Sequence, residues 1–342
     1  MAEIIPIHQH TENFNIAVKN LSDLCKEDLH SINTLILDKL DSSVPLIQEI
    51  GKYLILSGGK RLRPLLTTSC YHILNNQSTN GINHVGLAAA VEFIHAATLL
   101  HDDVVDLSKD RRGNLTANEV WGNKTSVLVG DFLFSRSFQL MTKYGTMKTL
   151  KILSDTSVII SEGEVLEISN DNNLEMNEDT YFEVINGKTA SLFSAACQVG
   201  GLSGGAKENQ HQALKSYGTN FGMAFQLIDD AIDYSSNLKT MGKNIGDDFK
   251  EGKITLPIIL AYGRSNKNEK DFLQKVFKEV DGNENNFFLV QELLIKYNCI
   301  EDTLIRANHF AEVAIDSLSI FPDNEYKKAL IKLIKTSINR LN

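Results

Sequence analysis

Hydrophobic residues recur at helical spacing along most of the chain. Between Leu21 and Leu40 they stand three or four positions apart, which places them on one face of an amphipathic helix. Similar patterns continue between turn-rich segments such as residues 57–59, 75–81 and 200–205. No segment shows the alternation of apolar and polar residues that is typical of a strand. The pattern therefore predicts an all-α fold.

Two of the predicted helices, Leu87–Val105 and Phe221–Ile232, are apolar around most of their circumference. Helices of this kind lie in the middle of large bundles. The most apolar stretch, residues 86–100, contains Glu92 and His95 and is too short to cross a bilayer. We predict two central bundle helices and no transmembrane segment.

Composition agrees with a helical fold in one piece. Only 5 of the 342 residues are proline, against an average usage of about 5%. No Pro- or Ser-rich linker and no short repeat divides the chain. We predict a single domain over residues 1–342, with residues 1–20 as a mobile N-terminal arm or a first short helix.

The charge and the cysteines restrict the class of protein. A net charge of −9 argues against nucleic-acid binding, which needs a basic surface. The four cysteines are far apart and form no CxxC pair, so we expect reduced thiols. The first residues lack a basic segment followed by an apolar one. These features predict a cytoplasmic protein.

Both central helices end in the same arrangement of acids, two adjacent aspartates followed by a third. In a helix, positions i and i+4 share a face, so these carboxylates repel one another. Neither segment contains a Lys or Arg to neutralise them. All-oxygen ligands suit Mg²⁺, and no His/Cys set accompanies them as zinc would require. One such cluster could equally be a solvated helix end, but two favour a shared metal site formed by Asp102, Asp103, Asp106, Asp229, Asp230 and Asp233.

Basic residues elsewhere in the chain supply a counterpart for phosphate groups. Arginine suits bidentate phosphate contacts, and lysine acts as a compact charge. The turn at residues 58–59 leads into one cationic group, a second follows the first acidic cluster, and three lysines each follow a glycine. His95 lies seven residues before Asp102, on the same helix face. The cationic candidates are Lys60, Arg63, Arg111, Arg112, Lys188, Lys243 and Lys253.

The order of these motifs resembles that of the trans-type polyprenyl diphosphate synthases, which elongate isoprenoid chains head to tail. The resemblance covers about two-thirds of the chain and is carried by residues 58–64, 92–95, 101–106, 111–113, 129–131, 187–190, 225–230, 246–248 and 251–257. It implies the isoprenoid synthase fold, a helical bundle around a deep central cavity with both aspartate motifs at its mouth. It also implies a homodimer.

The resemblance assigns roles to individual residues. It implies that three Mg²⁺ ions are held, when substrate is bound, by Asp102, Asp106 and Asp229, with Asp103 and Asp233 as close support and Asp230 as a further catalytic acid. The allylic diphosphate would contact Arg111, Lys188, Lys253 and Lys243. Isopentenyl diphosphate would bind Lys60, Arg63, His95 and Arg112. The side-chain dipoles of Thr189 and Gln226 would stabilise the allylic cation.

Product length depends on what lies below the first acidic cluster. Ala97 is five positions before Asp102, roughly 7.5 Å along the helix, and both Ala97 and Thr98 are small enough to let a growing chain pass. We expect Phe134 and Phe138, on a neighbouring helix, to form the floor. By resemblance, the product is octaprenyl diphosphate for quinone side chains, made from isopentenyl diphosphate and an allylic primer such as farnesyl diphosphate.

Three other functions remain open from the sequence. A short-chain farnesyl or geranylgeranyl diphosphate synthase is disfavoured by Ala97. A non-catalytic subunit of a heteromeric synthase usually lacks one of the motifs that this chain retains. A terpene cyclase would share the fold but would not need the predicted isopentenyl diphosphate site.

Overall fold

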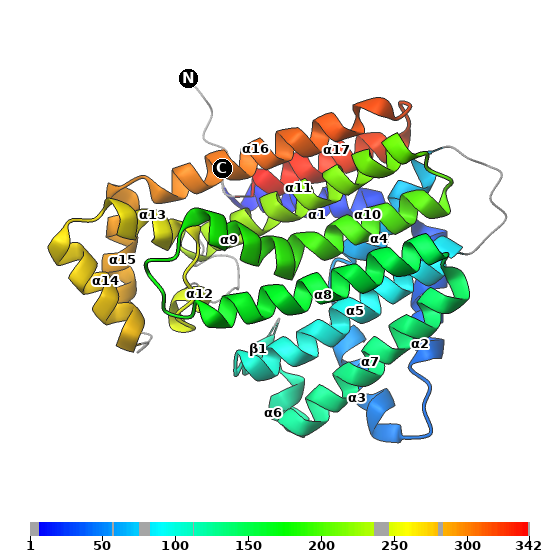
Figure 1. The fold of residues 1–342 in the computed structure, drawn as a ribbon, viewed down its shortest axis with the longest axis horizontal. Helices are drawn as coiled ribbons and strands as arrows, with labels where there is room; N and C mark the ends of the chain where they lie inside the picture. The colour runs from blue at the N-terminus through cyan, green and yellow to red at the C-terminus, as the bar shows by residue number, and fades with distance from the viewer. Residues whose placement is uncertain are drawn as a thin grey trace.

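The computed structural model describes residues 7–56, 58–74, 83–111, 113–235, 246–279 and 283–340, and these are helical almost throughout (Figure 1). The predicted all-α fold is confirmed. A two-residue hairpin of β1 (Asp110–Arg111) and β2 (Asn114–Leu115) is the one strand pairing in these ranges. The α-helices are α1 (Ile7–Leu24), α2 (Lys26–Lys39), α3 (Pro45–Leu56), α4 (Leu62–His72), α5 (Asn83–Val105), α6 (Ala117–Trp121), α7 (Asn123–Tyr144), α8 (Met147–Ser169), α9 (Glu178–Ile185), α10 (Ser191–Ser203), α11 (Glu208–Asp233), α12 (Asp247–Lys250), α13 (Leu256–Arg264), α14 (Lys267–Glu279), α15 (Glu284–Lys296), α16 (Cys299–Ser317) and α17 (Glu325–Ile338).

The two apolar helices of the sequence analysis, α5 and α11, run through the interior. α5 packs against α7, α4, α10 and α2, and α11 packs against α16 and α10. Among the described residues, α5 is the one helix whose length and composition would allow it to cross a membrane. The expectation that this stretch is too short for a membrane span is therefore wrong, because the helix is longer than its most apolar part. In this fold, however, 78% of its apolar stretch is buried inside the bundle, where such a helix is a core element.

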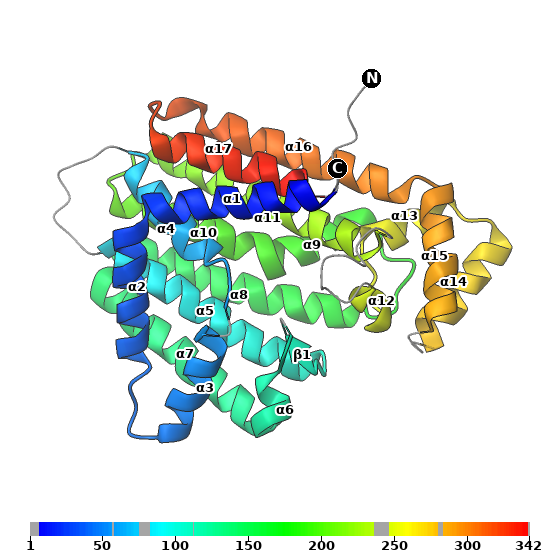
Figure 2. The same ribbon diagram turned by 180° about the vertical axis from the view of Figure 1, so that it is seen from behind.

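The N-terminal part of the chain forms a packed helix. α1 lies along α17 in both ribbon views (Figure 2). Phe14 of α1 is fully buried, in a core cluster that also contains residues of α4 and α17. Of the two alternatives for residues 1–20, the structure therefore has the helix from Ile7 onward, and residues 1–6 lie outside the described ranges.

A short π-helical segment, η1 (Asn186–Ala190), joins α9 to α10. π-helical turns inside helices are rare and frequently occur at functional sites. η1 carries the Gly-Lys-Thr motif and packs tightly on α8: a Cβ added to Gly187 would lie 2.8 Å from the Cα of Gly163. Only glycine permits this approach, and it brings Lys188 beside the acidic residues of α8.

Candidate active site

The C-terminal ends of α5 and α11 face one cavity of about 730 Å³. Asp102 of α5, Asp106 directly after α5 and Asp229 of α11 line it. The cavity thus brings together the three acids that were expected to hold metal. Arg112 and Lys243 lie outside the described residues. The other expected site residues that line the cavity are Lys60, Arg63, His95, Thr98, Arg111, Lys188, Thr189, Gln226 and Lys253.

Two further acids of the clusters, Asp103 and Asp233, accept hydrogen bonds from other parts of the protein. Asp103 is buried and accepts hydrogen bonds from Arg111, from Nε at 2.8 Å and from Nη2 at 2.7 Å. Asp233 accepts from the backbone N–H of Asp248 at 3.0 Å and of Asp247 at 3.2 Å, and so caps the first turn of α12. Burial raises the pKa of Asp233 to about 6, despite these two bonds. Asp103 thus holds Arg111, which lines the cavity, and Asp233 holds the start of α12.

Cations from distant segments reach the acidic clusters, although the clusters themselves contain none. Lys253 Nζ lies 3.1 Å from Asp106 Oδ2, and Arg340 donates from Nη1 to Asp229 Oδ1 at 2.8 Å. Among the described residues, Asp102 has no ion-pair partner. Its burial, together with the nearby charge of Glu164, raises the pKa of Asp102 to about 7. The carboxylate of Asp102 is suited to bind a hard cation, and such a cation would offset its repulsion from the neighbouring acids Glu164 and Asp106.

Lys188 is held by two acids that sequence reasoning missed. Its Nζ lies 2.5 Å from Glu167 and 3.0 Å from Glu164, one helical turn apart on α8. Burial alone would lower the pKa of Lys188, but the two glutamates outweigh it and hold the pKa above its usual range. Burial also raises the pKa of Glu164. The sequence did contain a signal for these two acids: they follow Gly163 at helical spacing from each other, and Gly163 permits the close contact of α8 with η1.

The basic end of the cavity lies at the start of α4. Arg61 precedes α4 with a left-handed backbone conformation, φ 49°, and its guanidinium binds buried Glu92 and the carbonyl oxygen of Ile55. The cations on either side of it, Lys60 and Arg63, line the cavity. The Nζ of Lys60 lies 4.6 Å from the centre of the Phe14 ring, over its face, which is a cation–π arrangement. Glu92, which interrupts the apolar pattern of α5, is therefore the buried ion-pair partner of Arg61 in the turn before α4.

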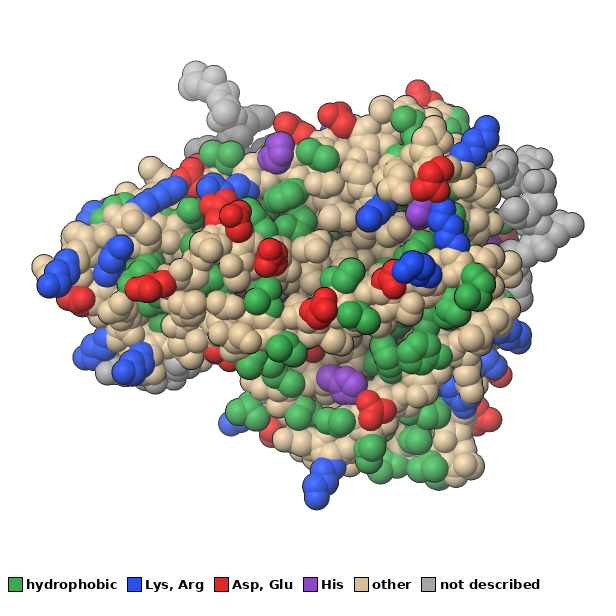
Figure 3. Space-filling model, in the orientation of Figure 1, with side chains coloured by type: hydrophobic (Ala, Val, Ile, Leu, Met, Phe, Trp, Pro, Cys, Tyr) green, Lys and Arg blue, Asp and Glu red, His purple; other side chains and the backbone are tan. Residues whose placement is uncertain are grey.

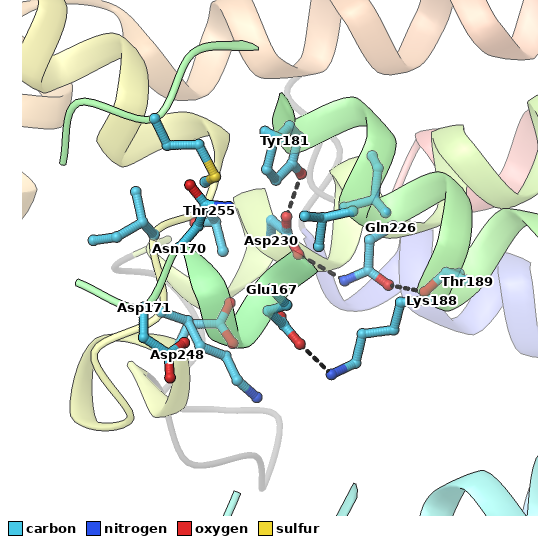
Figure 4. A pocket seen from close by; sticks show the side chains of 15 residues that line it. Glu167, Asn170, Asp171, Tyr181, Lys188, Thr189, Gln226, Asp230, Asp248 and Thr255 are labelled. Carbon is cyan, nitrogen blue, oxygen red and sulfur yellow. Dashed lines mark hydrogen bonds and ion pairs between the residues drawn. The ribbon is translucent and has the colours of Figure 1, made fainter. Parts of the chain in front are cut away.

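A series of hydrogen bonds runs from the cavity lining into the protein interior (Figure 4). Thr189 Oγ1 donates to Gln226 Oε1 at 2.8 Å, and Gln226 Nε2 donates to Asp230 Oδ1 at 2.7 Å. The hydroxyl of Tyr181 donates to the other oxygen of Asp230. Tyr181 and Asp230 line a small adjoining pocket of about 110 Å³ rather than the main cavity. Burial raises the pKa of Asp230 to about 7.

The polyprenyl synthetase family model matches residues 44–293 of this chain. The chain belongs to the polyprenyl synthetase family. It is 40% identical to the octaprenyl diphosphate synthase of Escherichia coli, over 94% of this chain and 99% of that protein. The predicted enzyme class, a trans-polyprenyl diphosphate synthase, is confirmed.

Solved structures of the family superimpose on nearly the whole chain. A decaprenyl diphosphate synthase from Rhodobacter capsulatus is 44% identical, with a TM-score of 0.90, and covers 95% of this chain and 99% of its own. A polyprenyl synthase from Caulobacter crescentus, complexed with calcium and isoprenyl diphosphate, is 43% identical, with a TM-score of 0.88, over 94% and 97%. These matches confirm the isoprenoid synthase fold.

The residues expected to control product length lie in two different places in this synthase. Ala97 is 1% exposed and is not among the residues that line the cavity, whereas its neighbour Thr98 is. Phe134 and Phe138 contact each other edge to face, with ring centres 5.1 Å apart, and line a separate groove between α7 and α8. That they form the floor for the growing chain stays a prediction.

Proposed function

We propose that this synthase condenses isopentenyl diphosphate repeatedly onto an allylic diphosphate, with farnesyl diphosphate as primer, to make all-trans octaprenyl diphosphate for quinone side chains. The observation that carries the proposal is the single cavity between two acidic helix ends and a basic turn. The relatives at 40% identity that are named octaprenyl diphosphate synthases support the product length.

We propose Mg²⁺ as the cofactor, with three ions per active site when substrate is bound. Asp102, Asp106 and Asp229 would hold the ions, and the carboxylate oxygens of these residues are the ligands that Mg²⁺ prefers. The bound ions would supply positive charge to the departing diphosphate. The raised pKa of Asp102 supports a cation at this residue, and the Caulobacter crescentus relative, solved in complex with calcium, supports a divalent metal in the family.

The cations of the cavity divide between two diphosphates. Arg111 and Lys253 pair with aspartates of the first cluster, and Lys188 lines the same cavity; these three would hold the allylic diphosphate through its ionisation. The second diphosphate, that of isopentenyl diphosphate, would bind at the turn before α4, through Lys60, Arg63 and His95. Arg112 and Lys243 are proposed for the same tasks from the sequence alone.

The carbon chemistry needs positioning and a dry cavity. When the allylic C–O bond breaks, its electron pair leaves with the diphosphate, and the double bond of isopentenyl diphosphate attacks the resulting cation. The oxygens of Thr189 and Gln226 line the cavity and would stabilise this cation. The new cation then loses a proton, for which the departed diphosphate is the base. Water must be excluded throughout, because it would quench the cation.

The test is a product-length assay with the full chain. Purified protein is incubated with Mg²⁺, farnesyl diphosphate and labelled isopentenyl diphosphate, and the products are separated by chromatography. We expect octaprenyl diphosphate, and no incorporation when the metal is chelated. A labelled product that stops at four isoprene units, one more than the primer, would show a short-chain synthase instead. A cyclic hydrocarbon would show a terpene cyclase, and no product would indicate a non-catalytic subunit.

We also propose a homodimer that forms through α7 and α8. Hydrophobic side chains gather over these helices on one face of the molecule (Figure 3). The groove between them has a volume of about 800 Å³ and includes Val158 and Val165, which are 57% and 62% exposed. An exposed apolar surface of this kind is typical of a protein interface. Two copies that pair through this same face would close a two-fold dimer.

The dimer is tested by measuring mass in solution. Val165→Lys places a charge in the groove and should convert a dimer into a monomer. Met147→Lys, at the start of α8 and 80% exposed, is the matched control and should leave the mass unchanged. A monomeric native protein would refute this proposal. We place the synthase in the cytoplasm, which the four free and buried cysteines support.

A further inference from the structure

The hydrogen-bond chain behind the cavity joins three separate elements. Tyr181 comes from α9, Thr189 from η1, and Gln226 and Asp230 from successive turns of α11 (Figure 4). Thr189 and Gln226 line the reaction cavity. Tyr181 and Asp230 are only 2% and 3% exposed and lie behind them. Tyr181 is not among the residues that line the reaction cavity, so we expect it to act there through other side chains.

The direction of each hydrogen bond in this chain follows from the carboxylate at its end. Both oxygens of Asp230 accept hydrogen bonds, one from Tyr181 and one from Gln226, so Gln226 turns its amide nitrogen toward Asp230 and its carbonyl oxygen toward Thr189. The single hydroxyl proton of Thr189 is then used in its bond to Gln226. What Thr189 can still offer to the cavity is oxygen lone pairs, which stabilise a neighbouring cation.

We propose that Tyr181 is a positioning residue for prenyl transfer. By holding Asp230 it fixes which group donates in each hydrogen bond from Asp230 to Thr189, so that Thr189 presents an acceptor oxygen to the allylic cation. Among the described residues, Tyr181 is the one hydrogen-bond partner of Asp230 Oδ2. Without the tyrosine hydroxyl, the carboxyl group loses the contact that holds its Oδ2 and is free to turn away from Gln226. The amide can then reverse and present N–H groups to Thr189. This inference rests on the proposed function.

Tyr181→Phe removes only the hydroxyl and leaves the buried ring. We expect kcat to fall about tenfold, with KM for both diphosphates within about twofold of the native enzyme, because the lost interaction acts in the transition state. Tyr217→Phe is the matched control. The hydroxyl of Tyr217 is also buried and donates to the carbonyl oxygen of Leu330 at 3.1 Å, away from the cavity. This control should melt at a lower temperature but keep the native kcat.

A double-mutant cycle separates positioning from a structural role. If Tyr181 acts through Thr189, then adding Tyr181→Phe to Thr189→Val should lower kcat by less than about twofold further. Asp230→Asn should show the same lack of additivity, because asparagine allows either orientation of Gln226. Melting curves show that each variant is folded. A native kcat in Tyr181→Phe, or effects that multiply, would overturn the inference. A native enzyme that makes no polyprenyl product would refute the proposed function instead.

Discussion

Arg340 donates a hydrogen bond from Nη1 to Asp229 Oδ1 at 2.8 Å and so connects the segment after α17 to the second acidic cluster. Its guanidinium carbon lies 4.7 Å from the ring centre of Phe225 and 5.1 Å from that of Phe14. Arg340 is 6% exposed and lines the cavity. Because buried arginine is rare unless it is paired, this residue is held in place as part of the site.

We predict that Arg340→Ala lowers the rate of prenyl transfer by about tenfold or more, because the cavity loses a fixed positive charge and Asp229 loses its partner. Arg340→Lys should not restore the rate, since an ammonium group cannot stack on Phe225 as the planar guanidinium does. Steady-state rates with both diphosphates measure the effect. Lys335→Ala, at an exposed position of α17, is the control. A near-native rate for Arg340→Ala would show that the arginine is only structural.

The close contact of η1 with α8 leads to a second prediction. A Cβ on Gly187 would lie 2.8 Å from Gly163 Cα and 3.0 Å from the carbonyl oxygen of Ile159. Gly187→Ala must therefore push the two elements apart and move Lys188 away from its glutamates. We expect a loss of about 1–3 kcal/mol in the free energy of unfolding, together with reduced activity.

The control for this substitution is Gly263→Ala. Gly263 lies in α13, and a Cβ there meets no atom within 4 Å. Alanine at such a site should leave stability unchanged or raise it slightly. Thermal or denaturant unfolding of both variants checks the comparison, and equal stabilities would contradict the steric argument.

Product length gives a third prediction. Ala97→Tyr should shorten the polyprenyl product, because a large ring would rise from α5 toward the cavity below Asp102. Thr98 lines the cavity directly, so Thr98→Tyr tests the adjacent face of the same helix. Ala97→Ser is the conservative control and should keep the native length. Chromatography of the products decides, and an unchanged length in Ala97→Tyr would contradict the proposed path of the chain.

The central helices could be predicted because their patterns are local. The all-round apolar character of α5 and α11, and the acids at their ends, can be read from consecutive residues. The partners of those acids could not, because Lys253 and Arg340 lie 147 and 111 residues away from Asp106 and Asp229. Such contacts depend on how the helices pack.

The π-helical turn was missed for a similar reason. The Gly-Lys-Thr motif was recognised, but its backbone conformation depends on the approach of α8 to Gly187. Tyr181 also carried no signal, since a tyrosine in an amphipathic helix is most often an ordinary core residue. Its importance arises from the distant carboxylate that it holds.

Asp28 joins three helices away from the cavity. Its two carboxylate oxygens lie 2.7 Å from His72 Nε2 and 2.8 Å from His84 Nε2, so both imidazoles donate to it. These contacts connect α2 to the end of α4 and the start of α5. Burial alone would raise the pKa of Asp28, but the hydrogen bonds from the two histidines outweigh it and hold the pKa well below its usual range.

Because the pKa of Asp28 is lower in the folded protein than in the unfolded chain, this stabilisation is fully present above the unfolded pKa of about 3.9 and is lost as the pH falls below it. At pH 7, Asp28→Asn should reduce the free energy of unfolding by about 2 kcal/mol, the usual value of hydrogen bonds to a charged group. That difference from the native protein should shrink as the pH is lowered below about 4, because Asp28 of the unfolded chain then takes up a proton while Asp28 of the folded protein does so only at still lower pH. Asp23→Asn removes a carboxylate that forms an exposed ion pair with Lys19 and should cost little at any pH. Urea unfolding at several pH values measures both variants, and a difference for Asp28→Asn that does not change with pH would show that its carboxylate charge does not contribute to stability.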